Sequence, residues 1–269
     1  MTSRGRFAPS PTGLTHLGTA STALLAWLSV RAQRGAYVMR MEDLDRRRVV
    51  AGSADGILGD LRWFGLDWDE GPDVGGPHAP YAQSERGPRY AAAFENLRTA
   101  GLVYPCFCSR KDIQSAASAP QAPGDEAHYP GTCRDLAQSE VVRRVSSGAA
   151  PAWRFRVDRA GIIPFTDRVR GRYEADPGSI GDFVVLRADG VPAYQLAVVV
   201  DDIAMRISEV VRGEDLLAST VRQLLLYRAF EATPPVFAHV PLLLGDDGAR
   251  LSKRHQGVTL RELRDAGES

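Results

Sequence analysis

The twelve residues 7–18, FAPSPTGLTHLG, constrain the fold of this chain more than any other stretch. They hold two prolines, two glycines, three hydroxyl side chains and one histidine, His16. A strand that turns through small residues into a helix leaves unpaired N–H groups at the helix N-terminus, where the helix dipole also favours an anion. The stretch therefore predicts a phosphate-binding turn with His16 beside it. The alternative is a proline-stiffened loop with a surface histidine.

The first hundred residues alternate between strand and helix. After the turn we expect an amphipathic helix that is capped by Thr15 or a neighbour and ends at Gly35. A strand follows in AYVMRMEDL (36–44), and then helices in SADGILGDLRWFG (53–65) and GPRYAAAFENLRTAG (87–101). This order predicts an α/β fold with a parallel sheet covered by helices.

The pattern changes at residue 106. Residues 106–190 hold all the cysteines, a proline- and alanine-rich run, and two short strand-like runs, AWRFRVD and FVVLRADG. From residue 191 the buried-strand rhythm resumes in AYQLAVVVDD (193–202), followed by a helix in ASTVRQLLLYRAF and a strand in FAHVPLLLG. We therefore predict a Rossmann-like domain in two halves, 1–105 and 191–269, interrupted by a small α+β insertion at 106–190.

Charge and hydropathy limit the class of protein. The 33 basic and 33 acidic residues balance, which argues against non-specific coating of nucleic acid but not against a local basic face. The arginine-rich stretch 153–172 would face RNA phosphates or form a solvated strand pair. No stretch approaches the roughly 20 apolar residues of a membrane span, and the N-terminus lacks an apolar signal core. We expect a cytoplasmic protein without a membrane partner.

Three cysteines, Cys106, Cys108 and Cys133, cluster within 28 residues. An odd set in a cytosolic chain is a poor disulfide framework, and three thiolates are one ligand short of tetrahedral zinc. His128 and Tyr129 are both near, and general ligand frequencies favour His128 as the fourth ligand. The cluster predicts a metal site; the alternative is three unrelated thiols.

Charged groups also follow apolar runs in RMEDLD (40–45), AYQLAVVVDD and VVRGEDL (210–216). In open α/β sheets the ligand crevice lies at the carboxyl ends of the strands. There Glu42 could hold an ammonium group, Arg212 could grip a carboxylate at two points, and Tyr194 could supply a hydroxyl. The alternative is ordinary surface ion pairing, which contributes little.

The loop RLSKR (250–254) lies near the end of the chain. A flexible lysine such as Lys253 can follow charge that develops on phosphorus, although most basic loops are solvated surface. Together with the histidine turn, the loop points to adenylation, in which a carboxylate attacks the α-phosphate of ATP and pyrophosphate leaves. Mg²⁺ is expected with the nucleotide.

With these motifs in this order, the chain resembles the class I aminoacyl-tRNA synthetases. HLGT (16–19) stands in the place of the HIGH motif and RLSKR in that of KMSKS, while MEDLD, AYQLAVVVDD and RGEDL are similar to the glutamyl branch. Only fifteen residues follow Arg254, where glutamyl-tRNA synthetases continue into an anticodon-binding region. With CFC and YPGTC, this resembles the family of glutamyl-queuosine tRNA(Asp) synthetases.

The resemblance implies a class I synthetase catalytic domain with a zinc-bearing insertion. It also implies a monomeric ligase that activates L-glutamate with ATP without tRNA and transfers it to the queuosine base in the anticodon of tRNA(Asp). Two alternatives are a truncated glutamyl-tRNA synthetase that charges a tRNA 3′ end and a non-catalytic RNA-binding paralogue.

The resemblance further implies the roles of individual residues. Glutamate-binding positions are Arg6, Ala8, Ser10, Glu42, Tyr194 and Arg212. ATP-binding positions are Pro9, Thr12, His16, Gly18, Thr19 and Lys253, with His16 and Lys253 catalytic. Ligands of a structural Zn²⁺ are Cys106, Cys108, Tyr129 and Cys133, with His128 as the alternative to Tyr129.

Overall fold

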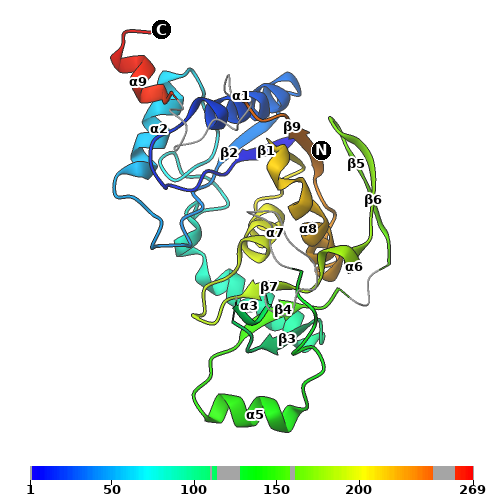
Figure 1. Ribbon diagram of the computed structural model, residues 1–269. Coiled ribbons are helices and arrows are strands. Elements are labelled where there is room, and N and C mark those ends of the chain that lie inside the picture. The colour runs from blue at the N-terminus through cyan, green and yellow to red at the C-terminus, as the bar shows by residue number, and fades with distance from the viewer. Residues whose placement is uncertain (1, 110, 114–127, 158–160, 245–257, 269) are drawn as a thin grey trace.

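A computed structural model of the protein describes residues 2–109, 111–113, 128–157, 161–244 and 258–268 (Figure 1). Its main sheet has six strands in the order β2-β1-β8-β9-β5-β6. The first four strands of this order run parallel to one another. They are β2 (Ala36–Met39), β1 (Arg4–Phe7), β8 (Glu209–Gly213) and β9 (Val236–Val240). The predicted α/β class with a mostly parallel sheet is confirmed.

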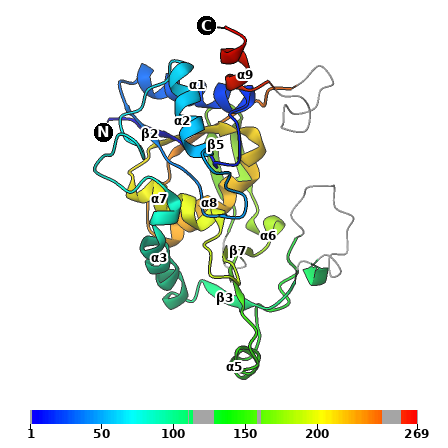
Figure 2. The same ribbon diagram turned by 90° about the vertical axis from the view of Figure 1, so that its left-hand side faces the viewer.

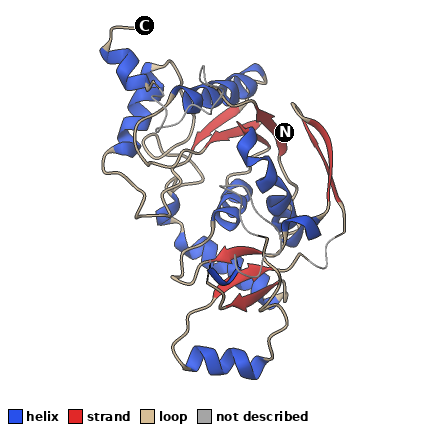
Figure 3. Ribbon diagram, viewed as in Figure 1, coloured by secondary structure: helices blue, strands red, loops and turns tan. Residues whose placement is uncertain are grey.

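The other two strands form a hairpin at one edge of this sheet. Strand β5 (Ile163–Asp167) joins β9 in parallel where Asp167 pairs with Phe237, and β6 (Gly171–Ala175) is antiparallel to β5. The hairpin stands at the edge of the molecule in Figure 3. Both strands come from the range 106–190, so part of that range is hydrogen-bonded to the main sheet.

Alternate residues of the central strands enter two different cores. Val210 and Phe237 pack with α7 (Tyr194–Ala204), α8 (Leu217–Ala229) and α3 (Gly87–Thr99). Val211 and Ala238 pack with α1 (Leu17–Ala32) and α2 (Ser53–Trp63). Because successive strand residues point to opposite faces, helices cover both faces of the sheet. The short α9 (Leu260–Asp265) contacts α2.

A second sheet of three antiparallel strands lies beyond α3. It has the order β3-β4-β7, with β3 at Val103–Cys106, β4 at Ala152–Phe155 and β7 at Phe183–Leu186. Helix α5 (Gln138–Ser146) has no buried residue and projects at the end of the molecule opposite α9 (Figures 1 and 2). Short turns of helix occur at Pro177–Ile180 (α6), Gln83–Glu85 and Glu214–Leu216. The predicted division into a domain and an insertion stays a prediction.

One local expectation is corrected. The run 193–202, expected as a strand, supplies residues 194–202 of helix α7. Residues 196–199 of this helix, LAVV, are at most 1% exposed, and an apolar run that is buried on all sides shows the same pattern as a buried strand. Helix α1 has His16, the neighbour of Thr15, at its N-cap position, and the His16 side chain makes no capping hydrogen bond.

Within the described part of the chain, no helix is both long enough and apolar enough to cross a membrane.

Candidate active site

A cavity of about 460 Å³ lies at the carboxyl ends of β1 and β8. Its wall begins with Arg6 and Phe7 of β1, continues through the turn that follows, and includes Arg212 and Gly213 at the end of β8. Parallel strands bring their carboxyl ends to one edge of the sheet. Segments about 200 residues apart in the sequence therefore meet around one space.

The cavity gathers the predicted substrate-binding residues. All those that lie in the described part of the chain line it: Arg6, Ala8, Pro9, Ser10, Thr12, His16, Gly18, Thr19, Glu42, Tyr194 and Arg212. Lys253 lies outside the described residues. Their common location is a geometric finding, and their individual roles stay predictions.

The histidine turn is held in shape from α2. The Ser53 hydroxyl donates to the Gly13 carbonyl at 2.7 Å and accepts from the Gly13 N–H at 3.0 Å. Gly13 has φ +137°, a backbone conformation that other residues rarely adopt. Where Gly18 would carry a Cβ, the described residues place no atom within 4 Å, apart from its chain neighbours and the backbone of its own helix. A ligand can therefore approach the start of α1 closely at Gly18.

The late part of the chain reaches the same turn. Leu242 and Leu243, which follow β9, line the cavity. The Leu17 N–H donates to the Val258 carbonyl at 3.1 Å, and the Leu260 N–H donates to the Thr15 carbonyl at 2.9 Å. Residues 245–257, which include RLSKR, are not described. The described residues on both sides of that segment lie at the cavity or at the histidine turn.

Two buried arginines give the cavity a positive end. Arg6 is 5% exposed and Arg212 is 3% exposed. Arg6 Nε lies 3.5 Å from Asp202 Oδ1, whereas Arg212 Nη1 is buried and has no hydrogen-bond partner among the described residues. A buried guanidinium with an unsatisfied N–H is costly in free energy unless an anion meets it. The pKa of Arg212 is lowered, chiefly because burial disfavours its charge.

Glu42 is the acidic group of the wall. It follows β2, and its backbone N–H donates to the Pro9 carbonyl at 2.9 Å, which places it beside the turn. Its carboxylate Oε1 lies 3.1 Å from Arg40 Nη2. Burial raises the pKa of Glu42 above the ordinary value, although Arg40 and Arg6 oppose that effect.

A network of buried ion pairs contacts Arg6 and Glu42. Arg40 Nη1 lies 2.7 Å from Asp202 Oδ1, and Arg86 Nε lies 2.6 Å from Asp201 Oδ1. Tyr90 also donates to Asp201 at 2.9 Å. Burial raises the pKa of Asp202, but the guanidinium groups of Arg40 and Arg6 outweigh burial, and the pKa lies below its ordinary value. Breaking such a network is strongly destabilising because it leaves an uncompensated buried charge.

Sequence reasoning missed several residues of the wall and its support. Asp215, Leu242, Leu243, Ile57 and Thr22 line the cavity without having been singled out. Asp215 lies within RGEDL, so its motif was a usable signal. The contacts of Arg86 and Tyr90 with Asp201 could not be predicted from the local sequence, because Asp201 is more than 100 positions away.

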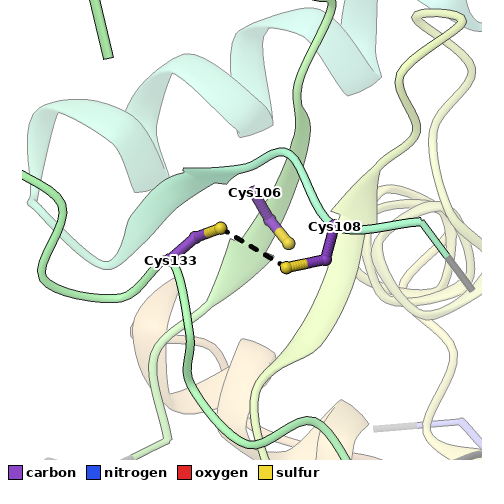
Figure 4. Close-up of side chains that lie close together, drawn as sticks. All are labelled: Cys106, Cys108 and Cys133. Atoms are coloured by element: carbon purple, nitrogen blue, oxygen red, sulfur yellow. Dashed lines mark hydrogen bonds between the residues drawn. The ribbon is translucent and has the colours of Figure 1, made fainter. Parts of the chain in front are cut away.

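The three cysteines form a separate cluster at the end of β3. Their sulfurs lie within 4.8 Å of one another, and those of Cys108 and Cys133 are 3.5 Å apart (Figure 4). Tyr129 Oη lies 3.4 Å from Cys106 Sγ and 3.8 Å from Cys108 Sγ. His128 Nδ1 instead lies 3.3 Å from the Ser179 carbonyl. The geometry brings Tyr129 to the sulfurs and leaves His128 outside their hydrogen bonds.

The chemistry of this cluster suits a metal ion. Three sulfur donors and one phenol oxygen converge, and soft thiolates are typical zinc ligands. Burial, and then the Cys133 thiol, raise the pKa of Cys108 to about 11. Arg154 Nε donates to Cys106 Sγ at 3.3 Å, and its guanidinium lies 3.9 Å from the centre of the Tyr129 ring. A cation therefore already stands beside the sulfurs and would offset the negative charge of thiolates.

The catalytic domain of the tRNA synthetases class I (E and Q) is the family model that matches this chain, over residues 3–268. The protein named glutamyl-Q tRNA(Asp) synthetase of Symbiobacterium thermophilum is 54% identical, across 98% of this chain and 82% of that protein. The protein of the same name from Nitratidesulfovibrio vulgaris is 53% identical, with the same shares covered.

Longer proteins match as well. The protein named glutamate–tRNA ligase 1 of Halorhodospira halophila is 45% identical over 98% of this chain and 55% of its own length. The solved glutamate-tRNA synthetase from Elizabethkingia anophelis superposes with a TM-score of 0.85 at 35% identity, covering 94% of this chain and 53% of that one. This chain thus spans about half the length of these ligases. By the match over residues 3–268, it belongs to the family of class I tRNA synthetases (E and Q), which are ligase enzymes, and carries their catalytic domain.

Proposed function

We propose that this protein activates L-glutamate with ATP in the cavity described above, forms glutamyl-adenylate without tRNA, and transfers glutamate to the queuosine base in the anticodon of tRNA(Asp). One observation carries the first step. A single cavity combines a histidine-bearing turn at a helix start with two buried arginines and a carboxylate. Glutamate carries two carboxylates, which are opposite in charge to Arg6 and Arg212, and one ammonium group, which is opposite in charge to Glu42.

The chemistry requires positioning and charge neutralisation more than acid–base work. An oxygen of the substrate α-carboxylate attacks the α-phosphorus of ATP. That bond forms as the bond from the α-phosphorus to the oxygen that bridges to the β-phosphate breaks, and pyrophosphate leaves with the electron pair. Mg²⁺ bound to the nucleotide reduces the negative charge of the phosphates.

Each predicted residue has a task in this step. Glu42 and Tyr194 orient the ammonium end of glutamate, and Arg212 binds a carboxylate. His16, with the backbone N–H groups near Gly18, holds the phosphates at the start of α1. Lys253 neutralises charge as pyrophosphate departs. Because described residues from both ends of a single chain line the cavity, we propose that a monomer performs the reaction, in the cytoplasm.

The tRNA specificity rests on relatives. Two proteins named glutamyl-Q tRNA(Asp) synthetase are more than half identical to this chain over nearly all of it. The second candidate, charging of a tRNA 3′ end, is favoured by the 45% identity to glutamate–tRNA ligase 1, of which this chain matches 55%. In either reaction a nucleophile of the RNA attacks the adenylate carbonyl, and AMP leaves.

We also propose that Cys106, Cys108, Tyr129 and Cys133 hold one structural Zn²⁺. The ion would join the end of β3 to the 129–133 turn, and four-coordinate sites of this kind stabilise folds without taking part in catalysis.

Two assays test the proposal. ATP–pyrophosphate exchange by the purified protein should depend on glutamate and proceed without RNA. The absence of exchange would contradict activation. Labelled glutamate should then pass to tRNA(Asp) that carries queuosine and not to tRNA(Asp) that lacks it. Transfer to tRNA(Glu) would instead support the second candidate.

A further inference from the structure

Arg212 is held in place by two uncharged side chains. Its Nε donates to His239 Nε2 at 3.0 Å, and its Nη2 donates to Thr220 Oγ1 at 3.0 Å. The remaining nitrogen, Nη1, is buried at the cavity wall and meets no hydrogen-bond partner in the part of the chain that the structure describes. The guanidinium is therefore fixed at two nitrogens, and neither partner offsets its charge.

The His239 ring has one assignable tautomer. Its Nδ1 lies 2.6 Å from Asp167 Oδ2, so the proton at Nδ1 is donated to that carboxylate. Its Nε2 must then accept the N–H of Arg212. A doubly protonated ring would set a donor against a donor at this contact, which favours the neutral form. Burial likewise lowers the pKa of His239 and, together with the Arg212 charge, outweighs the opposing effect of Asp167.

Asp167 is itself rigidly anchored. It is 1% exposed, and its carboxylate accepts the backbone N–H groups of His239 at 3.1 Å, Val169 at 3.0 Å and Arg170 at 2.9 Å. Asp167 ends β5, His239 lies in β9, and Arg212 lies opposite His239 in β8. A hydrogen-bonded chain therefore runs across three neighbouring strands to the cavity wall.

We propose that Asp167 and His239 are positioning residues for Arg212: they fix the direction of its guanidinium and leave its charge available to a substrate carboxylate. This inference rests on the proposed function, because it assumes that the carboxylate belongs to the amino acid being activated. Neither residue is among those that line the cavity. A carboxylate placed directly on Arg212 would compete with the substrate, whereas a neutral imidazole holds the group without competing.

A purely structural role for this buried pair makes a different prediction. Loss of packing would lower the melting temperature and the active fraction but leave the KM values of the folded enzyme unchanged. Loss of positioning would raise KM for the amino acid while KM for ATP stays constant. The separation of the two KM values therefore distinguishes the roles.

The test uses glutamate-dependent ATP–pyrophosphate exchange and isothermal titration of glutamate, on full-length protein checked for folding. His239→Leu removes the acceptor for Arg212, and KM for glutamate should rise about tenfold or more, the order expected for losing a hydrogen bond to a charged group. KM for ATP should stay within about twofold. His239→Gln keeps an uncharged acceptor and should recover part of the loss. Asp167→Asn removes the carboxylate that fixes the tautomer of the His239 ring, and it should raise KM for glutamate by a smaller factor.

Phe165→Leu is the matched control, because Phe165 lies in β5 near Asp167 but stacks on Tyr173. It should leave both KM values unchanged. An unchanged KM for glutamate in His239→Leu, or an equal rise in both KM values, would overturn the inference. If His239→Leu does not fold, His239→Gln and Asp167→Asn decide by the same criterion. A wild-type protein that neither exchanges nor binds glutamate would instead refute the proposed function, and the inference with it.

Discussion

At the scale of single residues, most of the predicted site residues come from one contiguous stretch of the sequence. Residues 6–19 run from the end of β1 through the turn into α1, so one stretch of sequence supplies most of one wall. Asp167 and His239 could not be found this way, since 72 positions separate them and each looks ordinary in its own segment. Their relation to Arg212 arises only from the order of strands β8, β9 and β5.

Glu42 should make glutamate binding depend on pH. Only the ionised carboxylate attracts the substrate ammonium, and burial raises the pKa of Glu42. KM for glutamate should therefore be constant at neutral pH and rise as the pH falls, starting at a higher pH than an ordinary glutamate would give. In Glu42→Gln, KM should be high throughout, without this dependence. ATP–pyrophosphate exchange kinetics across the pH range measure KM for glutamate in both proteins. A wild-type KM that stays constant into the acid range would contradict ammonium binding by Glu42.

The same substitution should not cost stability at neutral pH. Because the pKa of Glu42 is raised in the folded protein, its ionised form disfavours folding above that pKa, and a neutral glutamine removes this penalty. Arg40 keeps Asp202 as its partner at 2.7 Å. The melting temperature of Glu42→Gln at neutral pH should therefore match or exceed that of the wild type, and a marked drop would show that Glu42 is chiefly structural.

Gly18 tests the nucleotide end of the cavity. A Cβ at this position meets no side chain or neighbouring element in the described ranges, and alanine is about 1 kcal/mol better than glycine inside a helix. Gly18→Ala should therefore fold at least as stably as the wild type. If ATP phosphates approach the start of α1, KM for ATP should nevertheless rise about tenfold, the effect of a clash of roughly 1–2 kcal/mol. An unchanged KM for ATP would place the nucleotide elsewhere.

At the scale of elements, hydrophobic periodicity located β1, α1, β2, α2 and α3 but misassigned α7. The patterns of α1, α2 and α3 belong to helices that bury one face, whereas residues 196–199 of α7 are buried all round. Three consecutive valines also favour a strand by propensity, and packing between α3 and α8 overrides it. Strands β5 and β9 pair at one position, Asp167 with Phe237. Nothing in the sequence near either strand predicts this pairing.

The cysteine cluster joins β3 to the 129–133 turn and gives a paired test. Tyr129 Oη lies near two of the three sulfurs, while His128 bonds a carbonyl elsewhere. Tyr129→Phe should therefore weaken zinc binding, measured by competition with a chelator, and should lower the melting temperature. His128→Ala should change neither. The reverse result would make His128 the ligand, and an absence of zinc from the purified wild type would remove the site altogether.

At the scale of the whole molecule, the fold brings together segments from both ends of the chain. The histidine turn and residues 242–243 line one cavity, and residues 258–260 bond to the residues around His16. The resemblance to a known family predicted that these two segments lie together. No local sequence pattern shows which strand ends become neighbours in the sheet. In the sequence, the RLSKR motif falls between residues 243 and 258, and its role stays a prediction.

Lys253→Ala tests that role. If Lys253 stabilises the charge of the departing pyrophosphate, its removal should slow glutamate-dependent exchange by about 100-fold or more, the order seen when one preorganised charge-stabilising group is lost. The melting temperature should stay near that of the wild type. Lys111→Ala, which removes the only other lysine of the chain, serves as the control. Equal exchange rates in the two variants would exclude Lys253 from the reaction.

The most direct test of the central claim is a crystal structure of the protein with a non-hydrolysable analogue of glutamyl-adenylate. The analogue should occupy the cavity between β1 and β8, with its glutamyl carboxylate on Arg212, its phosphate mimic at the start of α1, and Lys253 in contact with it. An analogue bound outside this cavity, or a histidine turn and RLSKR loop that do not share the ligand, would contradict the account.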